Sequence, residues 1–176
     1  MGHDDNVENW TLADGTKLTL RHIAPADAAR EKAFVHGLSA TSSYFRFHGT
    51  IKDLSKKDLK RFTEPDSRNE AVLIVLCRGE AGEEEIGVAR YMIDPDRENG
   101  EFAIVVADAW QRRGIGTRLM NALMSHLRGS GVQQISGSVL TGNSAMRTLM
   151  KRMGFTEAGV HDDPSTLLVT KHLDLE

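Results

Sequence analysis

The sequence predicts a mixed α/β fold: one central sheet, flanked by helices, with an antiparallel first half followed by a parallel strand pair. Three apolar runs joined by tight polar connections predict antiparallel strands at residues 71–78, 86–93 and 101–107. The two connections are expected at residues 79–85 and 94–100. A helical pattern at residues 115–128 then leads into a strand-like run at 134–140, the order of a βαβ crossover, which predicts the parallel pair.

We expect residues 1–9 to be disordered and residues 10–176 to form a single domain. A chain of 176 residues is about one domain long and can bury a proper core. Two short strand-like runs flank Asp14-Gly15, a dipeptide typical of tight turns. A small hairpin should therefore begin the sheet.

Three helices are expected between this hairpin and the antiparallel strands. The first begins at residues 24–27 and ends near Gly37. The second begins at Ser39 and is rich in aromatic side chains, which we expect to be core and helix-packing residues rather than a substrate cage. The third follows Ser55, and Asp58 stands where a capping box needs its acidic partner.

The last part of the chain predicts one more helix and the strands that close the sheet. Asn143 caps a helical pattern over residues 144–153, and Gly154 ends it. The closing strands are expected at residues 155–158 and 166–173.

Composition narrows the class of protein. Hydrophobic residues at 40% and charged residues at 27% are ordinary for a globular domain. The net charge of −3 gives no electrostatic reason to expect nucleic acid or an anionic membrane as a partner. A single cysteine, Cys77, suits a reducing compartment, and the sequence shows no signal peptide or membrane-length apolar run, so we expect a cytoplasmic protein. Scattered histidines without ligand spacing predict no catalytic metal.

The loop at residues 111–116 is the strongest functional signal. It follows a strand and opens a helix, whose free N–H groups and positive dipole end favour an anion. A dinucleotide fingerprint would need glycine where Leu119 stands, and no Gly-Lys-Ser/Thr sequence is present for a Walker loop. What remains is the pattern Q-x-x-G-x-G; the alternative is a plain strand–helix turn with solvated arginines.

This pattern resembles the loop with which the GNAT superfamily of N-acetyltransferases holds the pyrophosphate of coenzyme A. Arginine suits that task because its planar fork donates paired hydrogen bonds to phosphate oxygens, and glycine lets the backbone approach the ligand. The resemblance implies the GNAT fold, acetyl-CoA as the acyl donor, and a parallel strand pair splayed at the acetyl-CoA site. It also implies that residues 39–47 lie near the acceptor side. The cofactor-binding residues that it implies are Val105, Val106, Gln111, Arg112, Arg113, Gly114, Ile115, Gly116, Thr117, Asn143, Ser144 and Arg147.

A second segment, residues 143–155, is similar to the GNAT pattern N-x-x-A/M-x-x-L-x-x-x-x-G-F. In that family the asparagine contacts the pantetheine end of the cofactor, although Asn143 can equally serve as a helix cap. Many members have a tyrosine as general acid where Met150 stands here. Tyr91 is a conceivable substitute, but we expect it to be a packing residue. A thiolate leaves tolerably without an acid, since a free thiol ionises at about pH 8.5.

Glu101 is the expected catalytic base. A lysine ammonium has a pKa of about 10.4, so transfer to an amine requires that its proton be removed. Strand alternation places Glu101, Ala103 and Val105 on one face unless a bulge intervenes. The alternative is a solvent-facing charge at the start of a strand.

Residues 10–173 also resemble, more narrowly, the acetyltransferase domain of bacterial Pat-type protein lysine acetyltransferases. The resemblance rests on the segments 14–47 and 101–104, on the Q-x-x-G-x-G loop, and on the Met146/Leu149 segment, which has Met150 in place of tyrosine. It implies Glu101 as the base and a protein lysine as acceptor, for example on an acyl-CoA synthetase. The attached sensing domain that such proteins often carry has no room in this chain.

We therefore expect an N-acetyltransferase that moves an acetyl group from acetyl-CoA to a primary amine by direct attack, with a protein lysine as the favoured acceptor. An enzyme acting on a small amine, a polyamine or an antibiotic is the alternative. A non-catalytic acyl-CoA-binding module is the alternative from another class. Acceptor identity and oligomeric state stay open, although a homodimer is common in the family.

Overall fold

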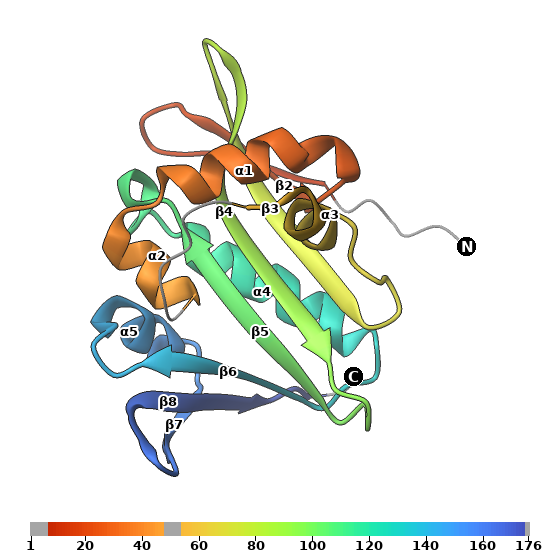
Figure 1. Cartoon of the computed structure of the whole chain (residues 1–176). Helices are drawn as coiled ribbons and strands as arrows, with labels where there is room; N and C mark the ends of the chain where they lie inside the picture. Colours follow the sequence, from red (N-terminus) through yellow and green to blue (C-terminus); the bar gives the residue numbers. More distant parts are fainter. Residues whose placement is uncertain (1–6, 48–53, 175–176) are drawn as a thin grey trace.

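The computed structural model describes residues 7–47 and 54–174, and it confirms the mixed α/β fold. Its eight strands form one sheet in the order β1-β2-β3-β4-β5-β6-β8-β7 (Figure 1). The strands are β1 (Glu8–Thr11), β2 (Lys17–His22), β3 (Glu70–Gly79), β4 (Gly82–Ile93), β5 (Asn99–Val106), β6 (Gln134–Leu140), β7 (Thr156–Val160) and β8 (Asp163–His172). The helices are α1 (Ala28–Gly37), α2 (Ala40–Phe47), α3 (Lys56–Thr63), α4 (Ile115–Arg128) and α5 (Ser144–Arg152), with short 3₁₀ turns η1 (Pro25–Asp27) and η2 (Asp108–Trp110).

Most elements lie where the sequence predicts them, and two expectations are corrected. The expected disorder over residues 1–9 does not hold for its end, because β1 begins at Glu8; residues 1–6 lie outside the described residues. The connection expected at residues 79–85 is shorter, because Glu83 to Glu85 pair with β3 in the sheet. No helix in the described ranges is both long and apolar enough to cross a bilayer.

The sheet is antiparallel except between β5 and β6. The parallel ladder there is short: Asn99, Gly100 and Glu101 lie opposite Gln134, Ile135 and Ser136 in turn. Beyond Glu101 and Ser136 the two strands diverge and leave a V-shaped opening in the sheet, which we call the fork. Helices α2 and α5 lie near its wide end (Figure 1). The fork is the place where the chain can admit a ligand into the sheet.

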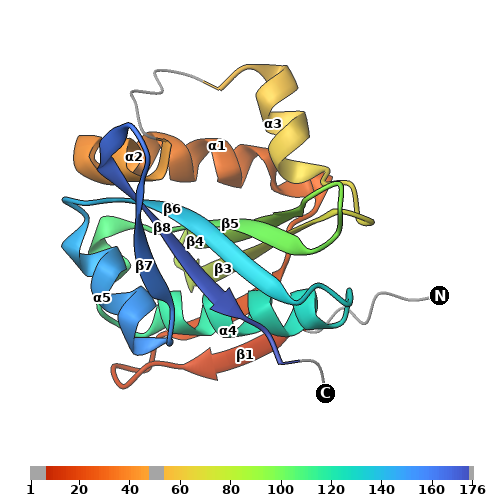
Figure 2. The same cartoon turned by 90° about the horizontal axis from the view of Figure 1, so that it is seen from below.

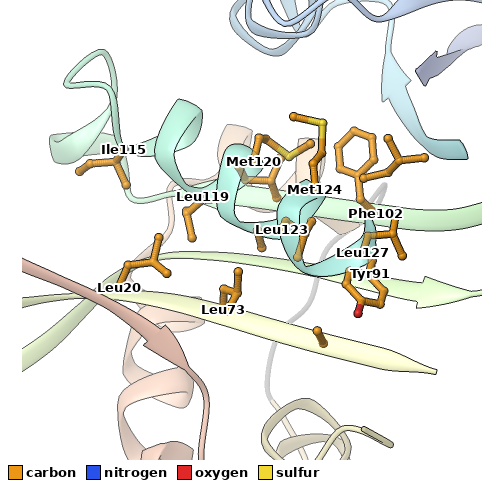
Figure 3. Close-up of a cluster of buried hydrophobic side chains, with 14 of the residues drawn as sticks. Leu20, Leu73, Tyr91, Phe102, Ile115, Leu119, Met120, Leu123, Met124 and Leu127 are labelled. Carbon is orange, nitrogen blue, oxygen red and sulfur yellow. The ribbon is translucent and has the colours of Figure 1, made fainter. Parts of the chain in front are cut away.

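Helices cover both faces of the sheet. Seen from below, α1, α2 and α3 lie on one side and α4 and α5 on the other (Figure 2). On the α4 side, Ile115, Leu119, Leu123 and Leu127 repeat at intervals of four and are completely or almost completely buried, as Figure 3 shows. Burial of each side chain stabilises the fold by about 1.5–3 kcal/mol.

Strand β5 contributes to both cores and is therefore held firmly. Phe102 and Ile104 pack in the α4-side core, whereas Val105 packs with the residues below α1 and α3. Gly100 allows α4 to approach closely, because a Cβ atom there would lie 2.7 Å from a methyl group of Leu127. The position of β5 fixes one arm of the fork.

Candidate active site

A cavity of about 800 Å³ fills the open part of the fork. One wall is β5 from Phe102 to Val106, and the other is formed by Ser138 and Val139 of β6 together with α5. Residues of helix α2 and of the loop at residues 111–117 complete the lining. The volume lies in the range of small-molecule and cofactor sites.

The loop before α4 is shaped by two left-handed backbone conformations. Arg112 has φ +63° and Gly114, the N-cap of α4, has φ +82°. The first helical hydrogen bond of α4 runs from the Arg118 N–H to the Gly114 carbonyl at 3.2 Å. The amides of residues 115–117 therefore have no acceptor within the helix, and Gly116 and Thr117 line the cavity. Such a helix end suits a phosphate group.

The two arginines of this loop have different surroundings. Arg112 lines the cavity. Arg113 instead lies over the ring of Trp110, 5.0 Å from its centroid, and its Nη1 is 3.7 Å from a carboxylate oxygen of Asp14. Only Arg112 of the pair is free to meet a ligand without leaving these neighbours.

Helix α2 is tied to the loop by polar contacts. The Gln111 side chain donates hydrogen bonds to the Val106 carbonyl at 3.0 Å and to the Ser42 hydroxyl at 3.4 Å. Hydrogen bonds from Ser39, and then from Ser42, hold the pKa of Asp108 below its usual value, so this carboxylate is ionised. The segment that we expected near the acceptor side is thus fixed to the segment expected to hold the cofactor.

Helix α5 provides the opposite wall. Asn143 lines the cavity while its Oδ1 accepts a hydrogen bond from the Met146 N–H at 3.2 Å, so it also caps the helix. Arg147 points elsewhere: it donates two hydrogen bonds of 3.0 Å to Glu157 and one of 3.2 Å to the Thr141 carbonyl. Met150 is completely buried in the core.

Glu101 lies at the narrow end of the fork. It is exposed, and its register places it beside Met92 of β4 and Ser136 of β6. It does not line the cavity itself, which begins with the next residue, Phe102. Tyr91, the conceivable general acid, is buried, and its hydroxyl lies 2.6 Å from Nδ1 of His126.

The structure brings most of the expected site residues together. Those that line the cavity are Val105, Val106, Gln111, Arg112, Gly114, Gly116, Thr117, Asn143 and Ser144. Those that do not are Glu101, Arg113, Arg147 and Ile115, whose side chain is buried in the core. Lining residues that the sequence did not predict include Asp108, Trp110 and Arg152, while Ser39, Ser42 and Arg46 belong to the segment expected near the acceptor side but were not named individually. For Arg46, the aromatic residues on both sides of it were the local sequence feature that drew attention to its segment.

Comparison with known proteins gives consistent matches. A family model described as an acetyltransferase (GNAT) domain matches residues 17–156. The chain is 28% identical over 163 residues to acetyltransferase PA5475 of Pseudomonas aeruginosa, which covers 92% of this chain and 88% of that protein. It is 33% identical over 136 residues to acetyltransferase Pat of Mycolicibacterium smegmatis, with 77% of this chain and 40% of that protein covered.

Among solved structures, the GNAT domain of S. lividans PAT superposes with a TM-score of 0.84 at 27% identity. The match covers 95% of this chain and 97% of that domain. The chain thus spans nearly all of an isolated GNAT domain and less than half of the M. smegmatis Pat protein.

Proposed function

This chain belongs to the GNAT family of acetyltransferases, whose acyl donor is acetyl-CoA, and we propose that it transfers the acetyl group to a primary amine. The observation that carries the proposal is the position of Glu101, next to the cavity and at the vertex of the fork. A carboxylate in this place can accept a proton from an amine that enters the fork.

The cavity residues fit the phosphate and pantetheine parts of the donor. The loop amides at the start of α4 and the Arg112 guanidinium would hold the pyrophosphate. Asn143 would contact the pantetheine from α5. The β5 backbone near Val105 and Val106 would orient the thioester and donate a hydrogen bond to its carbonyl oxygen as negative charge develops there.

The reaction would proceed by direct attack. Glu101, directly or through water, would take a proton from the acceptor ammonium, and the neutral nitrogen would attack the thioester carbonyl carbon. As the C–N bond forms, the C–S bond breaks and coenzyme A leaves as a thiolate. Met150 cannot donate a proton, and Tyr91 is buried and does not line the cavity, so neither is assigned as a general acid. A thiolate needs none, because its conjugate thiol ionises at about pH 8.5.

A protein lysine is the proposed acceptor, and an acyl-CoA synthetase is the protein class implied by the likeness to Pat-type enzymes. The similarity to the M. smegmatis Pat and to the S. lividans PAT domain supports this choice. Acetylation of a small amine, a polyamine or an antibiotic is the competing outcome.

The decisive experiment measures acetyl-CoA-dependent thiol release with lysine peptides, polyamines and aminoglycosides, and identifies products by mass spectrometry. Incubation of a cell lysate with labelled acetyl-CoA extends the search to protein acceptors. Acetylated lysine in peptides or lysate proteins is the expected result, whereas acetylation confined to small amines would favour the alternative. Tight acetyl-CoA binding without turnover above background for any amine would contradict the proposal.

A further inference from the structure

A cluster of buried charges lies directly behind the cavity, on the side of α1 and α2. Arg46 of α2 and Val105 of β5 line the cavity and also a second pocket of about 10 Å³, which is the size of one water molecule. Glu31 of α1 and Arg90 of β4 form other walls of this small pocket. Arg46 therefore stands between the open site and the charged interior.

The charged groups of this cluster are held away from water with incomplete pairing. Glu31 and Glu85 are only 2% and 3% exposed. A guanidinium nitrogen of Arg90 is 3.9 Å from a Glu31 oxygen, while the other Glu31 oxygen and the Arg90 Nε have no hydrogen-bond partner among the described residues. Phe62 lies against Arg90, with its ring centroid 4.6 Å from the guanidinium carbon.

The signs of these charges do not balance around Arg46. Burial, and then the neighbouring Glu31 carboxylate, raises the pKa of Glu85 to about 11, so Glu85 is neutral at pH 7. Burial, and then the like charge of Arg90, lowers the pKa of Arg46 to about 10, which leaves Arg46 charged at pH 7. Glu31 is the other carboxylate of this cluster, and it lines the small pocket together with both arginines.

Other charges nearby do not restore the balance. The Asp27 carboxylate accepts hydrogen bonds of 2.7–2.8 Å from Arg21 and Arg30, so it is already fully engaged. Glu70 and Arg61 also act on Arg90, with opposite signs. The described residues therefore leave an excess of positive charge at the cavity wall.

We propose that Arg46 is a specificity residue that binds a carboxylate carried by the acceptor a few bonds away from its reactive amine. A guanidinium that opens into a cavity, backed by an interior of excess positive charge, is suited to a carboxylate because it can donate two parallel hydrogen bonds. This inference rests on the proposed function, since it describes the acceptor of the same reaction.

The distance along β5 favours a long acceptor chain. Glu101 and Val105 lie on the same face of the strand, four residues or about 13 Å apart. The reacting amine must lie between these two residues, because it attacks the thioester near Val105 and passes its proton toward Glu101, so a carboxylate at Arg46 is separated from it by several bonds. Free lysine meets this requirement, and so does a peptide lysine with an aspartate or glutamate beside it.

The test compares matched acceptors that differ only in the carboxylate. One pair is a lysine peptide with a neighbouring aspartate and the same peptide with asparagine; the other pair is free lysine and lysinamide. The wild-type protein should prefer the carboxylate form by about 10- to 100-fold in kcat/KM, the range expected for a hydrogen bond to a charged group. The pair that shows the larger preference identifies the source of the carboxylate.

Variants then assign the preference to Arg46. Arg46→Gln should remove it while the KM for acetyl-CoA stays unchanged, Arg46→Lys should keep part of it, and the exposed control Arg68→Gln should keep all of it. Thermal unfolding of each variant checks the fold, and Arg46→Lys carries the comparison if the glutamine variant does not fold.

Two results would overturn this inference. Equal wild-type rates on both members of each pair would show that no carboxylate is recognised. A loss in Arg46→Gln that is the same for both members would assign Arg46 a structural role. Either result leaves amine acetylation intact, whereas failure to acetylate any amine would contradict the proposed function itself.

Discussion

Ser136 of β6 lies opposite Glu101 of β5, and this pair is the last step of the parallel ladder in the described part of the chain. On its other side Glu101 is in register with Met92 of β4. The backbone of Glu101 is thus fixed from two directions at the point where the fork opens. The Glu101 carboxylate is therefore attached to a backbone with a fixed position relative to the fork.

Replacing this carboxylate should separate proton removal from binding. Glu101→Gln should lower kcat by about 10²- to 10⁴-fold at pH 7, because an amide cannot accept the ammonium proton. The defect should shrink as the pH approaches about 10, where a lysine amine loses its proton to solvent. The measurement is kcat against pH with an acceptor that the wild-type protein uses.

Glu98→Gln is the matched control, since Glu98 is an exposed glutamate in the turn just before β5. Its rates should equal those of the wild-type protein. A Glu101→Gln variant with an unaltered pH–rate profile would remove Glu101 from the mechanism.

The contrast between Arg112 and Arg147 predicts different effects on the cofactor. Arg112→Ala should raise the KM for acetyl-CoA about tenfold or more, because a charge-assisted hydrogen bond to phosphate is lost. Arg147→Ala should leave that KM nearly unchanged, because Arg147 is already bonded to Glu157 and to the Thr141 carbonyl. Steady-state kinetics and calorimetric binding of coenzyme A measure both; equal effects would contradict this division.

Gly114 is expected to be sensitive to a single added methyl group. Nothing lies within 4 Å of a Cβ atom built there, so the strain of Gly114→Ala would come from its φ of +82° alone. We expect a cost of about 1–2 kcal/mol, seen as a lower Tm or as a distorted loop with weaker acetyl-CoA binding. Gly37→Ala is the control, because Gly37 has an ordinary φ and equally open surroundings. Indistinguishable variants would mean that the loop tolerates another conformation.

The buried carboxyl group of Glu85 should make the free energy of unfolding depend on pH in an unusual way. Its pKa is raised to about 11 by burial, so the folded protein keeps a proton that the unfolded chain releases above about pH 4.5. The stability linked to this proton is fully present below pH 4.5 and is lost as the pH rises toward 11. Glu85→Gln, which is neutral at every pH, should therefore have a Tm about 2–4 °C or more above the wild-type value at pH 8.

This difference should fade toward pH 4, where the wild-type carboxyl group is protonated in both states. Thermal unfolding at pH 4, 6 and 8 measures it, with Glu84→Gln, an exposed neighbour on β4, as the control. A constant offset at all three pH values would show that packing, rather than protonation, separates the two proteins.

Local patterns were sufficient for the elements that form the fork. The four-residue spacing from Ile115 to Leu127 predicts α4 with its observed bounds, and the apolar run of β6 is equally accurate. Gln111 and Asn143 belong to contiguous motifs, so their segments could be assigned to the cofactor before any contact was known. Such features can be predicted from the sequence because all of their residues lie within one short segment of the chain.

Contacts between distant segments leave no comparable trace. Ser42 accepts a hydrogen bond from Gln111, which is 69 residues away in the sequence, and neither local sequence predicts this contact. Arg147 of α5 was assigned to the cofactor by its position in a motif, whereas its partner Glu157 is on strand β7. The wall provided by Arg46 depends on how α1, α2 and β4 pack together. These relationships are set by the assembled fold rather than by any one stretch of the chain.

The short ladder between β5 and β6 leaves an open seam inside an otherwise continuous sheet. Backbone amides alternate along β5, so those of residues 102–106 point in turn toward β4 and toward the seam. The amides on the seam side should exchange with heavy water faster than their neighbours. A molecule that fills the seam will slow this exchange, so deuterium uptake over this segment reports occupancy even when no acetyl group moves.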